Sequence, residues 1–237
     1  MAKLIVIDGL DGSGKATQTE LLKQYLEKEK QYKVYKISFP DYESDSSAPV
    51  KMYLNGELGS DPETLNPYMC STFYAVDRAI QYIKNIKAMM NEGDNVIVLA
   101  DRYLSANIIH QGAKLKDEFK RHSFYEWDYE FETKLIGIPQ EDATIILSVP
   151  VEVSQKLMSH RYNNDESKKD IHESNIKYLE DCYFAATDAC EYLRSKGYRW
   201  EMIKCETCNE QGDPVGIKSI DEIHKEIIQK LKEMSLI

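Results

Sequence analysis

The stretch Leu4–Thr17 reads Leu-Ile-Val-Ile-Asp-Gly-Leu-Asp-Gly-Ser-Gly-Lys-Ala-Thr, and it decides the fold. Four apolar residues, typical of a buried strand, precede the pattern G-x-x-x-x-G-K, which runs from Gly9 to Lys15. The glycines let the backbone turn so that successive N–H groups point at one anion, and a following helix adds the positive end of its dipole. The stretch therefore predicts a strand, a phosphate-binding loop whose lysine reaches the terminal phosphates of a nucleotide, and a helix.

The residue after the loop lysine departs from the usual form of this pattern. That position normally carries Ser or Thr as a magnesium ligand, but here it is Ala16. Thr17 projects about 100° further round the helix and does not take over the same place. We therefore expect magnesium on Asp11, within the loop, or on Asp101, which follows the apolar run Val96–Ala100.

Short apolar runs alternate with longer segments of helical periodicity along the rest of the chain. The predicted strands are Leu4–Ile7, Val34–Ser38, Val96–Ala100, Thr144–Val149 and Trp200–Ile203. The predicted helices are Ala16–Lys30, Pro67–Asn91, Val151–Arg161, His172–Lys196 and Ile220–Met234. This alternation predicts an α/β fold with a mostly parallel sheet covered on both faces. Because no repeat or proline- and glycine-rich linker divides the chain, residues 1–237 are interpreted as one domain.

The charge balance argues against one class of partner. Forty acidic and thirty basic residues give a formal net charge of −10, whereas a nucleic-acid-binding protein normally presents a basic face. A small anionic ligand stays compatible with this balance because one local cluster of Arg and Lys is enough to bind it. The apolar runs are far too short to cross a membrane and no signal peptide is evident, so neither nucleic acid nor membrane is expected as a partner.

The cysteine count indicates the compartment. Five cysteines, an odd number in a chain of this size, suggest reduced thiols and a cytoplasmic location. Cys205 and Cys208 have the spacing of half a zinc site, but no second pair completes it, so a metal role is not expected. The polar segment Cys205–Gly216 around this pair is interpreted as a loop.

Four motifs occur in order along the chain: Asp8–Gln18, Phe39-Pro40, Tyr74–Arg78 and Asp101-Arg102-Tyr103. Together they resemble the thymidylate kinase family of P-loop nucleoside monophosphate kinases. The resemblance implies a doubly wound five-stranded sheet flanked by helices, with a mobile lid at about residues 160–173. It implies ATP-dependent phosphorylation of dTMP to dTDP by in-line transfer, in the synthesis of deoxythymidine triphosphate. It further implies Mg²⁺ and a homodimer.

The resemblance also implies roles for individual residues. The ATP phosphates would bind Gly12, Ser13, Gly14, Lys15, Ala16 and Thr17. The dTMP site would comprise Asp11, Phe39, Pro40, Tyr42, Tyr74, Arg78, Arg102, Asn107 and His110. Within it, Arg102 would grip the monophosphate, and Asp11 would contact the sugar 3′-hydroxyl or the metal shell. Lys15, Arg102, Arg161 and Asp11 would be the catalytic residues.

The positively charged lid residue that would contact the transferred phosphoryl group is either an arginine or a lysine. Family members place an arginine either in the phosphate-binding loop or in the lid, and this loop has none. Arg161, at the start of the polar stretch 163–170, is the favoured candidate, with Lys168 and Lys169 as alternatives. Arg is preferred because only its guanidinium offers a fork of donors to a phosphoryl group.

The chemistry of thymine favours Arg78 and Asn107 as readers of the base edge. Arg has donors only, so Arg78 beside the ring would donate to the O4 carbonyl of thymine and disfavour the amino group of cytosine. Asn107 can accept from N3–H, and Tyr74 can stack on the ring face. This readout predicts that dTMP is preferred over dCMP, and that dUMP is a poorer but real substrate.

Two other functions stay open at this point. One is a kinase for another deoxynucleotide or for a deoxynucleoside. The other is a regulatory protein whose phosphate-binding loop switches conformation without transferring phosphate to an acceptor. A switch protein would show slow hydrolysis that is independent of any acceptor.

Overall fold

The computed structural model describes residues 1–161, 170–208 and 214–237. Its main sheet has five strands, β1 (Lys3–Gly9), β2 (Lys33–Ser38), β3 (Val96–Asp101), β4 (Ala143–Ser148) and β5 (Trp200–Lys204). Their order is β2-β3-β1-β4-β5, and every neighbouring pair is parallel. The five predicted strands and their parallel arrangement are thus confirmed.

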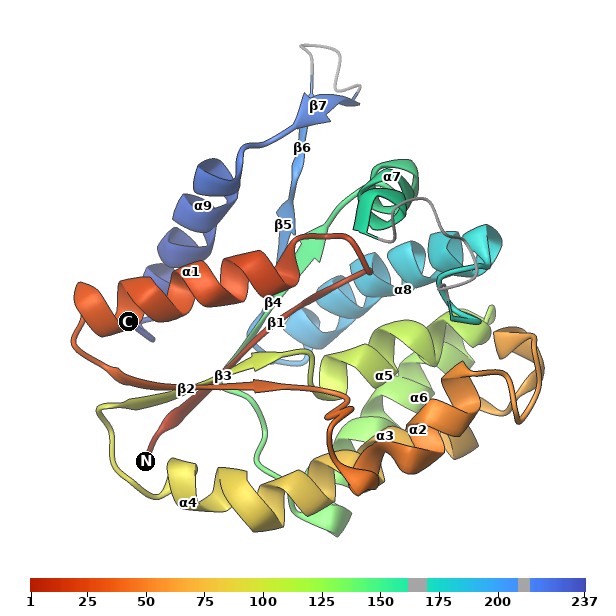
Figure 1. Ribbon diagram of the computed structural model, residues 1–237, viewed down its shortest axis with the longest axis horizontal. Helices are drawn as coiled ribbons and strands as arrows, with labels where there is room; N and C mark the ends of the chain where they lie inside the picture. Colours follow the sequence, from red (N-terminus) through yellow and green to blue (C-terminus); the bar gives the residue numbers. More distant parts are fainter. Residues whose placement is uncertain (162–169, 209–213) are drawn as a thin grey trace.

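Helices cover both faces of the sheet (Figure 1). On one face, Leu22 and Leu26 of α1 (Lys15–Lys28) and residues of α9 (Ile220–Glu233) pack on Ile5 and Ile7. On the other face, Leu4 and Val6 pack against helices that include α5 (Leu104–His110), α6 (Glu118–Tyr129) and α8 (Ile176–Ser195). Because successive strand residues point to opposite faces, an unbroken apolar run in β1 supplies both layers. The predicted doubly wound α/β fold is confirmed.

The remaining helical elements include residues that pack on the same face of the sheet as α5, α6 and α8. They are α2 (Ala48–Leu54), α3 (Pro67–Gln81), α4 (Lys87–Met90), α7 (Val151–Arg161), the π-helices η3 (Tyr82–Ile86) and η5 (Glu130–Ile136), and the 3₁₀ turns η1 (Asp45–Ser47), η2 (Pro62–Thr64) and η4 (Gly112–Lys114). The helix predicted over 67–91 forms with a π-helical segment inside it. Helix α8 begins at Ile176, four residues later than predicted, because Asn175 caps it by accepting a hydrogen bond from the Tyr178 N–H.

The segment predicted as a loop after β5 contains a hairpin instead. Strands β6 (Glu206–Cys208) and β7 (Pro214–Ile217) pair antiparallel and stand out from the body of the molecule (Figure 1). Cys205, at its base, is a buried free thiol. The predicted lid, 160–173, falls largely outside the described residues. Within the described part of the chain, no helix is both long and apolar enough to span a bilayer.

Candidate active site

The predicted phosphate-binding loop connects β1 to α1 as the sequence indicates. Gly9 has φ 147°, and a Cβ atom there would lie 2.5 Å from the Leu147 carbonyl oxygen of the neighbouring strand, so only glycine fits. Gly12 and Gly14 also have positive φ, and Gly14 precedes α1 without any side-chain cap. The first N–H groups of α1 are therefore available to an anion, reinforced by the helix dipole.

The Lys15 ammonium is held inside this loop. Its Nζ donates to the Leu10 carbonyl oxygen at 3.1 Å and to Asp11 Oδ1 at 3.2 Å. The side chain is buried. A cation fixed beside uncapped backbone donors is suited to bind the phosphate groups of a nucleotide.

Two cavities meet at this loop. The larger, of about 630 Å³, is lined by the predicted phosphate-binding residues and by Asp101, Cys205 and Lys218, among others. Such a volume is typical of a cofactor or nucleotide site. The second cavity is lined by Asp11, Phe39, Pro40, Tyr42, Leu54, Tyr74, Arg78, Arg102, Ala106, His110, Asp170 and His172. It holds only about 30 Å³, so a nucleotide-sized ligand requires lining side chains to move.

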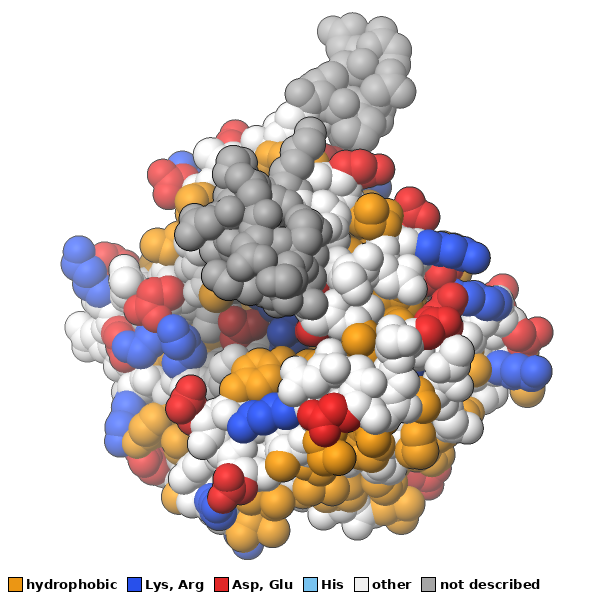
Figure 2. All heavy atoms as spheres, turned by 45° about the vertical axis from the view of Figure 1, so that its right-hand side comes forward, with side chains coloured by type: hydrophobic (Ala, Val, Ile, Leu, Met, Phe, Trp, Pro, Cys, Tyr) orange, Lys and Arg blue, Asp and Glu red, His pale blue; other side chains and the backbone are white. Residues whose placement is uncertain are grey.

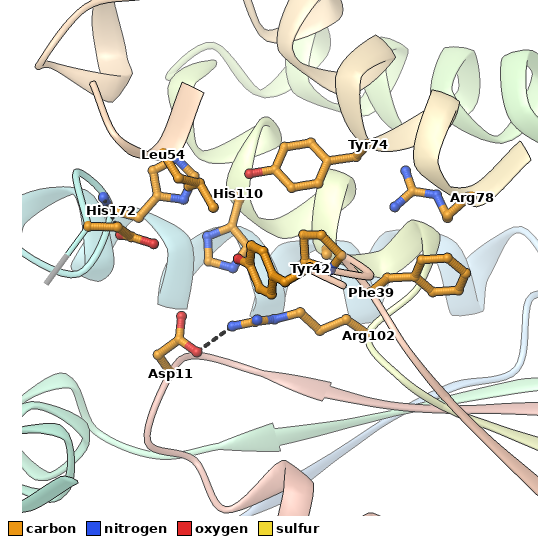
Figure 3. A pocket seen from close by; sticks show the side chains of 12 residues that line it. Asp11, Phe39, Tyr42, Leu54, Tyr74, Arg78, Arg102, His110 and His172 are labelled. Carbon is orange, nitrogen blue, oxygen red and sulfur yellow. Dashed lines mark hydrogen bonds and ion pairs between the residues drawn. The ribbon is translucent and has the colours of Figure 1, made fainter. Parts of the chain in front are cut away.

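Asp11 and Arg102 form an ion pair where the two cavities join (Figure 3). Burial by itself would raise the pKa of Asp11, but Arg102 and Lys15 hold this pKa well below its usual value. Arg102 has φ 65°, a left-handed conformation that is strained for an arginine. Its Nε has no hydrogen-bond partner among the described residues. A strained arginine with an unused donor at the end of a central strand is arranged for a ligand.

Most of the residues predicted for the acceptor site line the second cavity. Figure 3 shows Tyr42 in the middle of it, Tyr74 on the side of α3 and the guanidinium of Arg78 turned inward. The Asn107 side chain lies elsewhere: it is buried and its Nδ2 donates to Ser71, Asp128 and Glu132, and it is absent from the described lining, where Ala106 stands. The structure thus brings together every predicted acceptor residue except Asn107.

Sequence reasoning missed Asp170 and His172 as cavity residues. The His172 ring stacks on His110 at 5.4 Å between centroids, and its Nε2 lies 2.8 Å from the Tyr53 hydroxyl. Burial and the charge of Arg102 lower the pKa of His110 to about 3, so this ring is neutral near pH 7. The sequence predicts a helix from His172 onward, and nothing in this prediction indicates that Asp170 and His172 line the cavity.

Asp170 provides a stability test of this arrangement. Burial, with Glu173 and Asp11, raises its pKa from 3.8 to about 6. A raised carboxyl pKa means that the stability Asp170 contributes is present below about pH 4 and is lost as the pH rises through about 6. Asp170→Asn is therefore expected to raise the free energy of unfolding by about 1–3 kcal/mol at pH 7.5, and by roughly half as much at pH 5.

Chemical denaturation at both pH values measures this effect. The amide oxygen can still accept the N–H groups of His172 and Glu173, which both bond Oδ1 of Asp170. Asp94→Asn, at an exposed position, is the control and should change neither value. A destabilised Asp170→Asn protein at pH 7.5 would show that the carboxylate is favourably placed.

The acids of the site fit magnesium. Asp11 and Asp101 both line the larger cavity. No group of three or more His, Cys, Asp or Glu side chains that could hold a metal occurs among the described residues. Mg²⁺ usually binds one or two carboxylates and completes its octahedron with phosphate oxygens and water. Two carboxylates beside a phosphate loop match that requirement.

The predicted lid arginine can be placed only in part. Arg161 is the last residue of α7, and the structure does not describe its side chain. Lys168 and Lys169 lie outside the described residues. Which of these cations approaches the site therefore stays a prediction.

Comparisons with known proteins agree with this geometry. The family model described as thymidylate kinase matches residues 7–194. A probable thymidylate kinase of Saccharolobus solfataricus is 29% identical over 185 residues, covering 76% of this chain and 83% of the relative. The thymidylate kinase of Mycobacterium tuberculosis is 27% identical over 166 residues, covering 70% and 74%. The solved structure of thymidylate kinase from Candida albicans superposes with a TM-score of 0.68 at 19% identity, covering 99% of this chain and 93% of that one.

Proposed function

The chain belongs to the thymidylate kinase family, and we propose from the two adjoining cavities how its residues carry out the reaction of that family. The protein is a kinase that phosphorylates dTMP to dTDP, using ATP with Mg²⁺. One observation carries the proposal: Asp11, Tyr42 and Arg102 line both cavities. A donor and an acceptor bound on either side of these three residues would have their phosphates adjacent.

The larger cavity is the donor site in this proposal. The N–H groups at the start of α1 and the Lys15 ammonium bind the triphosphate. Asp11 and Asp101 would hold Mg²⁺, which would neutralise charge on the phosphates. Residues of β7 and the start of α9 close the far end of the cavity, where Ile217 and Ile220 provide apolar surface for the adenine ring.

The second cavity is the acceptor site. Arg102 binds the monophosphate of dTMP, and its Nε, 3.9 Å from Asp8 Oδ1, has no hydrogen-bond partner among the described residues. The attacking group is an oxygen of that monophosphate, which is already anionic, so the reaction needs positioning and cations more than a general base. Asp11 restrains Arg102 between the two sites. The lid cation, with Arg161 favoured, would stabilise charge on the transferring phosphoryl group.

Arg78 and Tyr74 form the base end of the acceptor site. The guanidinium presents N–H groups to the O4 carbonyl of thymine, and the Tyr74 ring offers a stacking surface. Neutral His110 and His172 line the same cavity. Asn107 must rotate its amide to reach the base, because its Nδ2 donates to the Ser71 carbonyl oxygen and to Glu132 outside the cavity.

A linked substrate tests whether the two sites adjoin. The probe joins the 5′-oxygens of adenosine and thymidine through five phosphates. If the cavities meet at Asp11 and Arg102, the probe competes with both ATP and dTMP and binds more tightly than either nucleotide, because its second half is held at a high effective concentration. Competition with only one of the two substrates would contradict the adjoining sites.

We also propose a homodimer that uses one face of α3 and of η3, which continues it. Met69 and Val76 of α3 and Ile83 of η3 are exposed at intervals of seven residues, which places them along one side of this continuous helical segment. Figure 2 shows hydrophobic side chains gathered on the lower part of the molecule, the part that α3 occupies in Figure 1. A charged residue in the middle of this side would leave an unpaired charge in the interface.

Val76→Lys is therefore expected to convert the dimer to a monomer at micromolar concentration, as measured by sedimentation velocity. Ile176→Lys, at an exposed apolar position of α8, is the control and should leave the dimer intact. A Val76→Lys protein that sediments like wild type would exclude this face.

A cytoplasmic location is likewise proposed. The four cysteines that are described with their side chains, Cys70, Cys182, Cys190 and Cys205, are free and buried. Free thiols of this kind are in keeping with a reducing compartment. Cell fractionation followed by immunodetection tests the location.

A further inference from the structure

A buried polar network lies directly behind the base end of the acceptor cavity. At its centre is Glu132, a fully buried carboxylate in the π-helix η5. The network connects Arg78 of α3, Asn107 of α5 and Asp128 of α6 to this residue. π-Helical turns inside longer helices occur frequently at functional sites. None of the roles considered so far uses Glu132.

Glu132 fixes the plane of the Arg78 guanidinium. Arg78 Nε donates to Oε2 at 2.6 Å and Nη2 donates to Oε1 at 2.5 Å, while Nη1 donates to the Tyr103 carbonyl oxygen at 3.1 Å. These bonds occupy three of the five N–H groups of the guanidinium. The two bonds to Glu132 and the bond to Tyr103 fix the plane of the guanidinium. Each of its two remaining N–H groups therefore points in a fixed direction. Figure 3 shows the guanidinium of Arg78 turned toward the cavity beside Tyr74.

The same carboxylate orients Asn107. Asn107 Nδ2 donates to Glu132 Oε1 at 3.0 Å, so one oxygen of Glu132 accepts from both of the residues that sequence reasoning assigned to the base edge. With its nitrogen committed, Asn107 turns its Oδ1 away, and this buried oxygen has no hydrogen-bond partner among the described residues. Glu132 therefore determines which atoms of both side chains stay available.

The charges of the network support a single ion pair. Burial and the nearby Glu132 raise the pKa of Asp128 well above its usual value, which favours the neutral form of Asp128 beside the ion pair. The pair of Arg78 and Glu132 then carries no net charge in a region without solvent. A buried pair of this kind often adds little stability compared with apolar residues of the same size, and fixing one conformation is a role by which it can be retained.

We propose that Glu132 is a positioning residue that sets the choice of acceptor base. It holds Arg78 so that an unpaired N–H faces position 4 of the pyrimidine, where a carbonyl accepts and an amino group is repelled. This inference rests on the proposed acceptor site. In this proposal the preference for thymine over cytosine depends on the fixed orientation of Arg78 as well as on its charge. A freely rotating guanidinium would move aside for the 4-amino group of cytosine.

Glu132→Gln tests the proposal with almost no change in shape. In the variant, the NH₂ group of glutamine faces one of the Arg78 N–H groups that a Glu132 oxygen accepts in the wild type. Arg78 therefore loses one hydrogen bond and the fixed orientation of its guanidinium plane. We expect kcat/KM for dTMP to fall about 10- to 100-fold, mainly through KM, and kcat/KM for dCMP to fall much less. The dTMP/dCMP ratio should therefore shrink several-fold or more, with KM for ATP unchanged.

Glu130→Gln, an exposed neighbour in the same π-helix, is the control and should keep the wild-type ratio. Equal losses on dTMP and dCMP in Glu132→Gln would mean that Glu132 only stabilises the fold, and would overturn the proposal. A wild-type enzyme without a preference for dTMP would contradict the proposed function instead, so the two failures are distinguishable.

A measurement on the unmodified protein covers the case in which Glu132→Gln does not fold. Protein with ¹⁵N-labelled arginine is followed by NMR, with the Arg78 Nε–H signal assigned through Arg78→Lys. A guanidinium fixed by Glu132 gives a sharp Nε–H signal, protected from exchange with water, before dTMP is added and after it. A signal that is broadened by rotation until dTMP binds would show that the substrate, and not Glu132, orders Arg78.

Discussion

Lys15→Ala is expected to lower the rate of phosphoryl transfer to dTMP by about 10³-fold or more. The Lys15 ammonium is buried and sits beside the first N–H groups of α1, bonded to Leu10 and Asp11 within the loop. In such a site a cation interacts strongly with the charge of the transferring group, and no solvent takes its place. Neither Ala16 nor Thr17 carries charge, so nothing adjacent along the helix compensates for it.

Initial rates of ADP formation at saturating ATP and dTMP measure this loss. Lys23→Ala is the matched control, because Lys23 lies on the same helix and pairs with Glu27 at the surface. Its turnover should stay within about twofold of wild type. A Lys15→Ala enzyme that retained more than about a tenth of wild-type turnover would contradict the role given to this lysine.

Arg102→Met is expected to lower kcat/KM for dTMP by about 10³-fold, with a much smaller effect on KM for ATP. The substitution removes the proposed contact to the acceptor phosphate. It also leaves Asp11 without its main ion-pair partner, so the pKa of Asp11 should rise. Arg102→Lys keeps the charge without the fork of donors and should fall between wild type and Arg102→Met.

The double variant Arg102→Met/Asp11→Asn tests the contribution of the ion pair to stability. In Arg102→Met the Asp11 carboxylate keeps only the 3.2 Å contact with Lys15 among the described residues, so removing its charge should raise the free energy of unfolding above that of Arg102→Met. Arg194→Ala, at an exposed arginine on α8, is the control for general charge effects. An Arg102→Met enzyme with normal kcat/KM for dTMP would remove Arg102 from the acceptor site.

The central part of the fold could be predicted from sequence because its strands are short apolar runs. β1 and β4 are buried along nearly their whole length, so each contains a run of consecutive apolar residues, Leu4–Ile7 and Ile145–Leu147, that is easily recognised. Helix α6 was not predicted because the face it buries includes Arg121 and Asp128 beside Phe124. Buried charged residues disguise the apolar periodicity on which such predictions depend.

The residues of the candidate site likewise divide into those that local sequence motifs predict and those whose placement depends on contacts with distant parts of the chain. Gly9 and Lys15 belong to a local motif in which spacing alone indicates the chemistry, whereas the role of Arg102 follows from the family resemblance. The partner of Arg78 could not be found in this way, since Glu132 lies 54 positions further along the chain, on a different helix. Asn107 was assigned to the cavity from its position on α5, but its amide direction is set by Glu132. Pairings of this kind arise only when distant helices pack together.

One measurement tests the central claim most directly: initial rates of ADP release with ATP and Mg²⁺ across dTMP, dUMP, dCMP, dAMP, dGMP and thymidine. The account predicts rapid release with dTMP, with dTDP as the product in equal amount, slower release with dUMP, and release with dCMP at least tens-fold slower. Slow ADP release that is the same with every acceptor, or a preference for unphosphorylated thymidine, would contradict it.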